Sequence, residues 1–389
     1  MERKMGSTLE KCFMIIKFAD NIVSPLGFTS KENFEAILSG HTELKEHGKV
    51  FNCHENFYGS LFNRKSLNYL IKKEISDIHD VTFFEKICIF SAHSAIRECK
   101  IDPSSKDVIF VLSTTKGNVE KLSENLDISS AYLANSAKVI SKYFNNPNQP
   151  VVVSNACISG VSAQIAGIRL LLTGKYKYAV IIGCDVLSQF IISGFQSFKA
   201  LSDNQCKPFD RERIGLNLGE AAGTIILVRD ENLKKGDWFY VASSNHNDAN
   251  HISGPSRTGE GSFRVLQDIR ESIEIEEIAF INVHGTSTAY NDEMESIAIE
   301  RAQLTDVPIN GLKGFYGHTL GAAGIIETII SMKAVDAGVV LATKGFENLG
   351  TSREVNISSQ NRNTDKKVFI KLLSGFGGSN AGICYAKKM

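Results

Sequence analysis

Short apolar runs of strand length alternate with helix-like patterns along this chain of 389 residues. Six of the runs predict buried strands, at residues 107–113, 150–154, 178–183, 224–228, 278–283 and 368–373. Helical patterns lie between several of them, for example at residues 159–172 and 320–337. This alternation predicts an α/β protein with mainly parallel or mixed sheets. A last pair of strands is expected to turn around residues 374–382.

One charged, glycine-containing segment interrupts the alternation. Residues 229–237 read RDENLKKGD and directly follow the predicted strand at residues 224–228. Such clusters mark loops and boundaries between structural units. We therefore predict two domains, residues 1–230 and 231–389, both of ordinary domain size.

The charges balance, with 43 Lys and Arg against 43 Asp and Glu. Since no overall charge attracts the chain to nucleic acid or to an anionic membrane, neither is expected as a partner. The apolar run at residues 12–16 is too short for a signal peptide, and the longer runs cannot span a bilayer. The eight cysteines lack metal-ligand spacing and are interpreted as reduced thiols, which predicts a cytoplasmic location.

Cys157 lies where an apolar strand runs into a turn of small residues. Residues 151–160 read VVVSNACISG, and a helical pattern follows them. Because the free N–H groups and the dipole of a helix N-terminus favour a thiolate, this position predicts a lowered pKa for Cys157. An inert buried cysteine is the alternative, and the local sequence leaves both open.

Two of the nine histidines lie in turns of small residues at the ends of predicted elements. His284 is part of VHGTST, and His318 is part of GFYGHTLGAAG. Catalytic groups tend to occupy such positions, although a lone histidine in a turn is commonly a structural hydrogen-bonding residue. Zinc binding is the other functional alternative. Since neither an HExxH pattern nor a cysteine cluster supports it, no metal is expected.

Taken in order, these motifs resemble those of the elongating β-ketoacyl-(acyl carrier protein) synthases of the thiolase superfamily. The similar segments are VSPLG (23–27), Cys157 with its turn, PFDRERIGLNLGEAAG (208–223), VHGTSTAYNDEMES (283–296), KGFYGHTLGAAGIIE (313–327) and GFGGSNAG (375–382). Chain-starting relatives use Cys-His-Asn and thiolases use Cys-His-Cys, so His318 indicates the elongating class. The resemblance implies a thiolase-like fold of two similar α/β halves that form a layered α-β-α-β-α core.

The resemblance also implies a decarboxylative Claisen condensation that needs no cofactor. Cys157 would take an acyl group from acyl carrier protein, and malonyl-loaded carrier protein would lose carbon dioxide and attack it. The product would be a β-ketoacyl carrier protein of fatty acid synthesis or of specialised polyene- or polyketide-type lipid synthesis. His284 and His318 would hold the enolate oxygen as neutral N–H donors. The implied assembly is a homodimer, or a heterodimer with a chain-length partner.

Further residues acquire roles from the same resemblance. The backbone N–H groups of Cys157 and Phe376 would form an oxyanion hole, and Gly377 and Gly378 would let Phe376 gate the acyl pocket. Lys313 would support the histidines electrostatically and pair with Glu327. Five other charged residues are expected to form structural salt bridges: Asp210, Arg213, Glu220, Asp292 and Glu295.

The chain departs from the family in three segments. The opening strand at residues 16–27 is degenerate, and residues 113–118 read STTKGN where relatives have a glycine-rich turn that helps shape the acyl pocket. Chain-length preference is therefore not predicted. Residues 79–99 lack the basic cluster that relatives often present to an acidic carrier protein. The nearby basic substitutes are Arg64, Lys65, Lys72 and Lys73.

Two other functions fit parts of the sequence. A non-catalytic partner that sets chain length usually lacks the nucleophile, whereas Cys157 and both histidines are present here. A cysteine hydrolase would need an Asn or Asp to orient its histidine and a path for water, which two histidines in a dry site fit poorly.

Overall fold

The computed structural model describes residues 13–389 except 54, 76–77, 79, 125–127, 249 and 252–253. Its largest element is a mixed sheet of ten strands. In chain order these strands are β1 (Met14–Val23), β4 (Val108–Ser113), β5 (Val151–Val153), β6 (Tyr178–Asp185), β8 (Ala221–Asp230), β9 (Trp238–Asn247), β10 (Ile278–Asn282), β11 (Ile309–Asn310), β14 (Val368–Gly375) and β15 (Ser379–Lys387). All six predicted runs form strands, and five of them are buried. The sixth, β5, is half-buried and lies at the edge of the sheet.

The two halves of this sheet repeat one topology. The strand orders are β5-β4-β6-β8-β1 and β11-β10-β14-β15-β9. When the strands of each half are numbered separately in chain order, the two orders are identical. In each half the first two pairings are parallel and the next two are antiparallel. The halves meet where Ile16 of β1 pairs with Phe239 of β9. This repeat confirms two similar α/β halves, while the boundary after residue 230 stays a prediction.

The helices of the described residues cover the sheet and fill the space between its halves. They are α1 (Ser30–Leu38), α2 (Arg64–Glu74), α3 (Phe83–Cys99), α4 (Leu133–Tyr143), α5 (Ser159–Leu172), α6 (Gln189–Ser197), α7 (Glu260–Arg270), α8 (Ala289–Arg301), α9 (Lys313–Tyr316) and α10 (Ala323–Asp336). Short 3-10 helices are η1 (Val119–Glu124), η2 (Ile128–Ala131), η3 (Ile275–Glu277) and η4 (Leu320–Ala322). Two small sheets consist of β2 (Lys45–His47), β3 (Phe57–Ser60) and β7 (Leu218–Gly219), and of β12 (Val339–Val340) and β13 (Arg362–Asn363).

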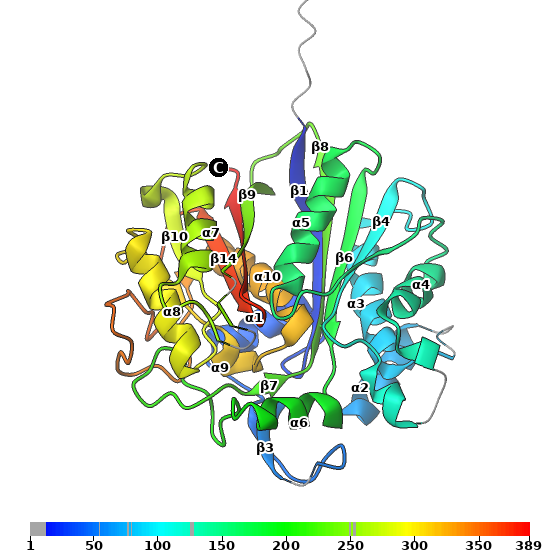
Figure 1. Cartoon of the computed structure of the whole chain (residues 1–389). Coiled ribbons are helices and arrows are strands. Elements are labelled where there is room, and N and C mark those ends of the chain that lie inside the picture. The colour runs from blue at the N-terminus through cyan, green and yellow to red at the C-terminus, as the bar shows by residue number, and fades with distance from the viewer. Residues whose placement is uncertain are drawn as a thin grey trace, which may run out of the picture.

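Helices α5 and α10 form the central layer between the strands of the two halves (Figure 1). Helix α10 is almost entirely buried and α5 is mostly buried, because strands of both halves pack against them. A Cβ atom at Gly160 of α5 would lie 2.8 Å from the Cα atom of Gly324 in α10, so the glycines allow this close crossing. On the outer faces, α3 covers the N-terminal half and α7 and α8 cover the C-terminal half. The result is the predicted layered core.

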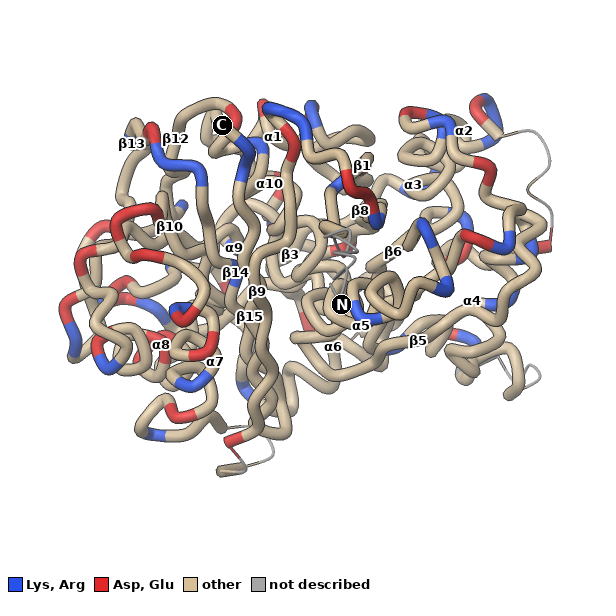
Figure 2. The backbone as a smooth tube through the Cα atoms, turned by 90° about the horizontal axis from the view of Figure 1, so that it is seen from above, with Lys and Arg blue, Asp and Glu red and all other residues tan. Residues whose placement is uncertain are grey.

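Two predicted boundaries shift. The helix expected at residues 320–337 consists of the 3-10 helix η4 followed directly by α10. In the last hairpin, Gly375 pairs with Ser379, so the turn occupies residues 376–378 and is tighter than expected. Charged residues of both signs are interspersed over the outside of the molecule (Figure 2). No helix in the described part of the chain is long and apolar enough to cross a membrane.

Candidate active site

Three segments that are far apart in the sequence bring Cys157, His284 and His318 together. Cys157 lies between β5 and α5, His284 follows β10, and His318 lies between α9 and η4. The thiol sulfur and one ring nitrogen of each histidine all lie within 4.8 Å of one another. The three residues are 7%, 3% and 1% exposed, respectively. The sequence-predicted trio is therefore one buried cluster.

The backbone turns sharply just before Cys157. Ala156 has a φ of 44°, in the left-handed region that residues with a Cβ atom rarely adopt. The end of β14 approaches this turn so closely that a Cβ atom at Gly375 would lie 3.2 Å from the Cys157 nitrogen. The next residue, Phe376, directs its backbone N–H to the thiol. Cys157 is thus placed against the glycine-rich hairpin turn.

The prediction of a lowered pKa for Cys157 is wrong. Burial raises the pKa of the thiol to about 11, although Lys313, Lys116 and the Phe376 N–H act in the opposite direction. The helix N-terminus alone would favour the thiolate. The loss of hydration on burial disfavours the thiolate more strongly than the nearby charges and the N–H group favour it. At neutral pH the residue is therefore a thiol.

Both histidines are neutral hydrogen-bond donors. The backbone N–H of Leu320 donates to Nδ1 of His318 over 3.3 Å, which places the ring proton on Nε2. That Nε2 and the Nδ1 of His284 are buried without a hydrogen-bond partner among the described residues. Burial, reinforced by Lys313 and Lys371, lowers the pKa of both rings well below its usual value. The rings are T-shaped, with centroids 5.1 Å apart.

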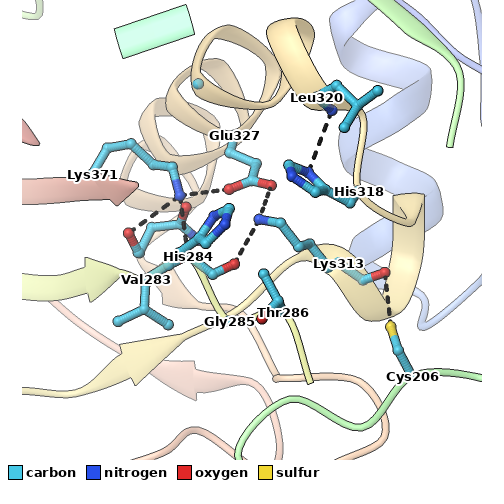
Figure 3. Close-up of polar contacts among 12 residues, drawn as sticks. Cys206, Val283, His284, Gly285, Thr286, Lys313, His318, Leu320, Glu327 and Lys371 are labelled. Carbon is cyan, nitrogen blue, oxygen red and sulfur yellow. Dashed lines mark hydrogen bonds and ion pairs between the residues drawn. The ribbon is translucent and has the colours of Figure 1, made fainter. Parts of the chain in front are cut away.

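A buried ion-pair network surrounds the histidines (Figure 3). Lys313 Nζ lies 3.0 Å from Glu327 Oε1 and donates to the His284 carbonyl oxygen over 2.6 Å. Lys371 Nζ lies 2.5 Å from Glu327 Oε2 and donates to the Val283 carbonyl oxygen over 3.1 Å. These contacts tie α9, α10 and β14 to the turn that carries His284.

The network carries two ammonium groups and one carboxylate, all at most 1% exposed. Burial acts to raise the pKa of Glu327, but Lys313 and Lys371 outweigh it and lower this pKa. Burial lowers the pKa of Lys371 to about 8 even though Glu327 acts to raise it. The positive potential left over keeps the neighbouring imidazoles neutral.

Two cavities meet at Cys157. The larger, of about 970 Å³, extends between the segment at residues 115–122 and helix α6. The smaller, of about 480 Å³, also contains both histidines. Phe376 lines both cavities, and its ring lies 6.0 Å from that of Phe195 and 5.5 Å from that of Phe198. This aromatic group therefore stands between the two cavities beside the thiol.

Comparisons with known proteins agree with this geometry. The N-terminal domain of the beta-ketoacyl synthase family matches residues 66–232, and the C-terminal domain of the same family matches residues 240–347. Together these matches cover more than half of the chain. The chain belongs to the β-ketoacyl synthase family. It is accordingly an acyltransferase, as predicted.

Individual relatives extend the match over the whole length. The 3-oxoacyl-(acyl-carrier-protein) synthase 2 of Synechocystis is 24% identical over 406 residues, covering 94% of this chain and 96% of that protein. The synthase of the same name from Rhizobium meliloti is 31% identical over 255 residues, covering 61% of this chain and 60% of that protein. A ketosynthase from Xenorhabdus doucetiae, solved in complex with its chain length factor, has the same fold, with a TM-score of 0.82 and 21% identity over 96% of this chain and 98% of that one.

Asp292 and Glu295, which were expected to form structural salt bridges, accept hydrogen bonds from backbone N–H groups. Asp292 accepts the N–H groups of Phe209 (2.7 Å) and Thr286 (3.0 Å), and Glu295 accepts those of His284 (2.6 Å) and Gly285 (2.8 Å). They therefore hold the backbone of the histidine turn. Burial raises the pKa of Asp292 to about 6 and that of Glu295 to about 7.

The remaining three residues of that group also bind backbone groups. Glu220 accepts the N–H groups of Phe62 and Leu187, and it does form an ion pair, with Arg64 at 3.6 Å. Asp210 accepts backbone N–H groups of the segment at residues 347–348, and Arg213 donates to backbone carbonyl oxygens. Among the described residues, an ion pair within 4 Å confirms the salt-bridge prediction for Glu220 and for none of the other four.

Two buried charged residues near the site, Lys371 and Asp185, escaped the sequence analysis. Lys371 stands in the middle of an apolar run, and a lysine inside a strand that is buried on both faces was the available signal. Asp185 ends β6 and accepts hydrogen bonds from Thr114, Thr115, Lys116 and the N–H of Gly321. It fixes the segment STTKGN, whose Thr115 and Lys116 line the larger cavity.

The distances among Cys157, His284 and His318 would also suit a metal ion. The charge of the site and the protonation of His318 distinguish a metal site from an anion site. The ammonium groups of Lys313 and Lys371 give the site a positive potential, which opposes a cation. The Leu320 N–H already occupies Nδ1 of His318 and leaves a proton on Nε2. The donor set fits an incoming oxygen anion better than a cation.

Proposed function

We propose that Cys157 carries the acyl group while His284 and His318 stabilise the enolate in a β-ketoacyl synthase reaction. The observation that carries this proposal is the convergence of one thiol and two neutral imidazoles within 4.8 Å in a buried site. The cavities on both sides of Cys157 provide room for an acyl chain and for the second substrate. Both substrates are thioesters of acyl carrier protein.

The first step is a thioester exchange. The Cys157 sulfur attacks the acyl carbonyl carbon, the bond to the carrier sulfur breaks, and the thiol proton ends on the departing carrier thiol. The carbonyl oxygen becomes negative during the attack. The N–H groups of Cys157 and Phe376 would hold it, as such donors do in other acyl transfers. The ammonium group of Lys313 lies close enough to lower the pKa of the Cys157 thiol. Its positive charge favours the negative carbonyl oxygen for the same electrostatic reason.

The second step forms the carbon–carbon bond. The malonyl thioester loses carbon dioxide, and the electron pair moves into an enolate. His318 Nε2–H and His284 would donate to the enolate oxygen, and each such donor lowers the barrier by roughly 3 kcal/mol. The enolate carbon then attacks the acyl carbon, and Cys157 leaves as a thiolate that regains a proton. The products are carbon dioxide and a β-ketoacyl thioester.

The surrounding residues would support these steps. Lys313 donates to the His284 carbonyl oxygen and is held by Glu327. Burial and the charges of Lys313 and Lys371 lower the pKa of both imidazoles, so the rings stay neutral donors. Gly377 and Gly378 have φ values of 86° and 75°, which few other residues tolerate. We infer that they let the turn move, so that Phe376 opens the larger cavity to the acyl chain.

The relatives support the choice of partners. The Synechocystis and Rhizobium meliloti proteins are named as synthases acting on acyl-carrier-protein, and the Xenorhabdus structure pairs a ketosynthase with a chain length factor. We infer that carrier proteins deliver both substrates and that the enzyme works as a dimer, with a second copy or with a chain-length subunit. The pathway, fatty acid or specialised lipid synthesis, and a cytoplasmic location stay predictions.

The two alternative functions have less support. In a cysteine hydrolase, an Asn or Asp would accept a hydrogen bond from the Nδ1–H of the catalytic histidine. His284 Nδ1 has no such partner in the described part of the chain. A non-catalytic subunit would not need a thiol at the junction of two cavities.

Intact-protein mass spectrometry tests the nucleophile. After incubation with hexanoyl-loaded acyl carrier protein, the wild-type protein is expected to gain one hexanoyl group, located on the peptide that contains Cys157. The Cys157→Ala variant should gain none. Cys206→Ala is the matched control, because this second buried cysteine is also near Lys313 but lines neither cavity. Equal labelling of wild type and Cys157→Ala would contradict the proposal.

A further inference from the structure

The larger cavity beside Cys157 combines aromatic walls with an ammonium group. Its lining contains the side chains of Phe51, Phe190, Phe195, Phe198 and Phe376. Lys116 lines the same cavity and is half-buried there, on the segment STTKGN. A plain alkyl chain suits the aromatic walls, but it offers no hydrogen-bond acceptor to an ammonium group that it would shield from water.

The charge of Lys116 lacks a counter-ion inside this cavity. Among the described residues, its Nζ atom donates only to the carbonyl oxygen of Thr115, over 3.4 Å. Glu120 is the other charged residue of the lining, and it lies 3.8 Å from a guanidinium nitrogen of Arg64. Lys116 therefore brings a positive charge to the cavity that no carboxylate of the described chain balances.

Ser188 adds a second polar group without a partner to the same lining. The residue is 5% exposed, and its Oγ atom is buried with no hydrogen-bond partner among the described residues. Ser188 directly precedes α6, but its side chain makes no capping hydrogen bond to that helix. Since an unpaired buried hydroxyl is unfavourable, a hydroxyl of this kind in a cavity wall points to a ligand that pairs with it.

Asp185 holds the segments of Lys116 and Ser188 together. Strand β6 ends at Asp185, and the chain continues through Ser188 into α6. The Asp185 carboxylate accepts the backbone N–H of Lys116 over 3.2 Å, and it accepts the N–H and the hydroxyl of Thr115 over 2.9 Å each. The loop that carries Lys116 is thereby fixed to the segment that leads to Ser188. Two donors on such a fixed backbone suit a binding subsite.

From these contacts we propose that Lys116 and Ser188 form a subsite for a carboxylate on the acyl chain. The inference rests on the proposed function, because the acyl group is the one that Cys157 carries. The ammonium and the hydroxyl donate to the carboxylate oxygens, and the aromatic walls pack against the methylene groups. The substrate class is the half-thioester of a dicarboxylic acid. This second carboxyl group takes no part in the thioester exchange, so the bonds formed and broken stay the same.

Lys116 also acts on the thiol itself. Burial dominates the pKa of Cys157 and raises it, while Lys313 and Lys116 act in the opposite direction. The ammonium of Lys116 is therefore near the reacting sulfur. If Lys116 served only the thiolate, it would accelerate acylation by every donor equally. A carboxylate subsite accelerates acylation only by donors that carry the carboxylate, so a comparison of donors separates the two roles.

The test compares acyl donors of equal length. Acyl carrier protein is loaded with glutaryl or pentanoyl groups and with adipoyl or hexanoyl groups, and intact-protein mass spectrometry follows the acylation of Cys157. In at least one pair, the wild type should react faster with the carboxylated donor. Lys116→Met should lower the ratio of the two rates at least about tenfold, because hydrogen bonds to a charged group are lost. Ser188→Ala should lower the same ratio about threefold or more.

Lys199→Met is the matched control, because Lys199 lines the smaller cavity and not the larger one. Its ratio should equal that of the wild type, and an equal fall in this variant would contradict a subsite at Lys116. A wild type that prefers the plain donor at both lengths, or an unchanged ratio in Lys116→Met or Ser188→Ala, would overturn the proposal. Either variant decides alone if the other does not fold. A wild type in which no donor acylates Cys157 would overturn the proposed function itself, whereas acylation by the plain donors alone would overturn only the subsite.

Discussion

Replacement of Glu327 by Gln should destabilise the fold more than the loss of either lysine it pairs with. The carboxylate is 1% exposed and lies 3.0 Å from Lys313 Nζ and 2.5 Å from Lys371 Nζ. Without it, two buried ammonium groups face each other with no counter-ion. Breaking a buried ion pair by removing one partner costs about 3–5 kcal/mol, so we expect a loss in the free energy of unfolding in this range.

Lys371→Met is the informative companion variant. It removes one charge but leaves Lys313 paired with Glu327, so the buried site becomes neutral. The cost comes from the carbonyl oxygens of Asn282 and Val283, which lose their donor, and should stay below about 2 kcal/mol.

Equilibrium unfolding in urea measures both changes. Fluorescence of Trp238, the single tryptophan and a buried one, follows the transition. With a slope of about 3 kcal/mol per molar urea, the Glu327→Gln midpoint should fall by more than about 1 M. If Lys371→Met proves as destabilising as Glu327→Gln or more so, the electrostatic reasoning about the network is wrong.

Three further outcomes follow from the same structure. The alkylation rate of Cys157 with iodoacetamide should still be rising at pH 10, because burial raises the thiol pKa to about 11; a plateau below pH 8.5 would contradict this. The stability advantage of wild type over Lys371→Met should grow with pH between about 8 and 10.5, by at most about 1.4 kcal/mol per pH unit. In that pH range Lys371 is protonated in the unfolded chain but has lost its proton in the folded protein. Urea midpoints of the two proteins measure the stability difference, and a difference that shrinks with pH would contradict this prediction. Gly377→Ala and Gly236→Ala should cost similar stability, about 1–2 kcal/mol, since their φ values are 86° and 91° and neither Cβ atom would meet a neighbour. Only Gly377→Ala should slow hexanoyl transfer in stopped-flow assays, and equal rates would argue against a moving turn.

Much of the fold could be predicted because strand and helix periodicity is local. The apolar runs at residues 178–183 and 368–373 predict buried strands, and both lie inside the sheet. The hairpin turn at residues 376–378 was expected to be longer because glycines permit several turns, and the pairing of Gly375 with Ser379 depends on the partner strand.

The site was predictable in position but not in its electrostatics. Motif order located Cys157, His284 and His318, because each lies shortly after a strand or before a helix that the sequence predicts. Desolvation depends on everything packed around a group, so the raised pKa of Cys157 could not be read from its position before a helix. Lys371, which completes the network, was missed although a lysine inside an apolar strand was an available signal.

The hydrogen-bond partners of the acidic side chains could not be predicted from the sequence either. Asp292 and Glu295 follow the histidine motif closely, but only the folded turn shows that they bind backbone N–H groups. Lys116 and Ser188 likewise lie in separate segments, and only the fold brings them to one cavity.

A single-turnover assay of His318→Ala tests the central claim most directly. The variant is first acylated with hexanoyl-loaded acyl carrier protein, checked by mass spectrometry, and then mixed with malonyl-loaded carrier protein in a rapid-quench experiment. If His318 donates to the enolate oxygen and takes no part in acylation, as we propose, the variant should acylate like the wild type and form β-ketooctanoyl product about 10²–10³-fold more slowly. An equal loss of acylation and condensation, or condensation at the wild-type rate, would contradict the separation of roles between Cys157 and the two histidines.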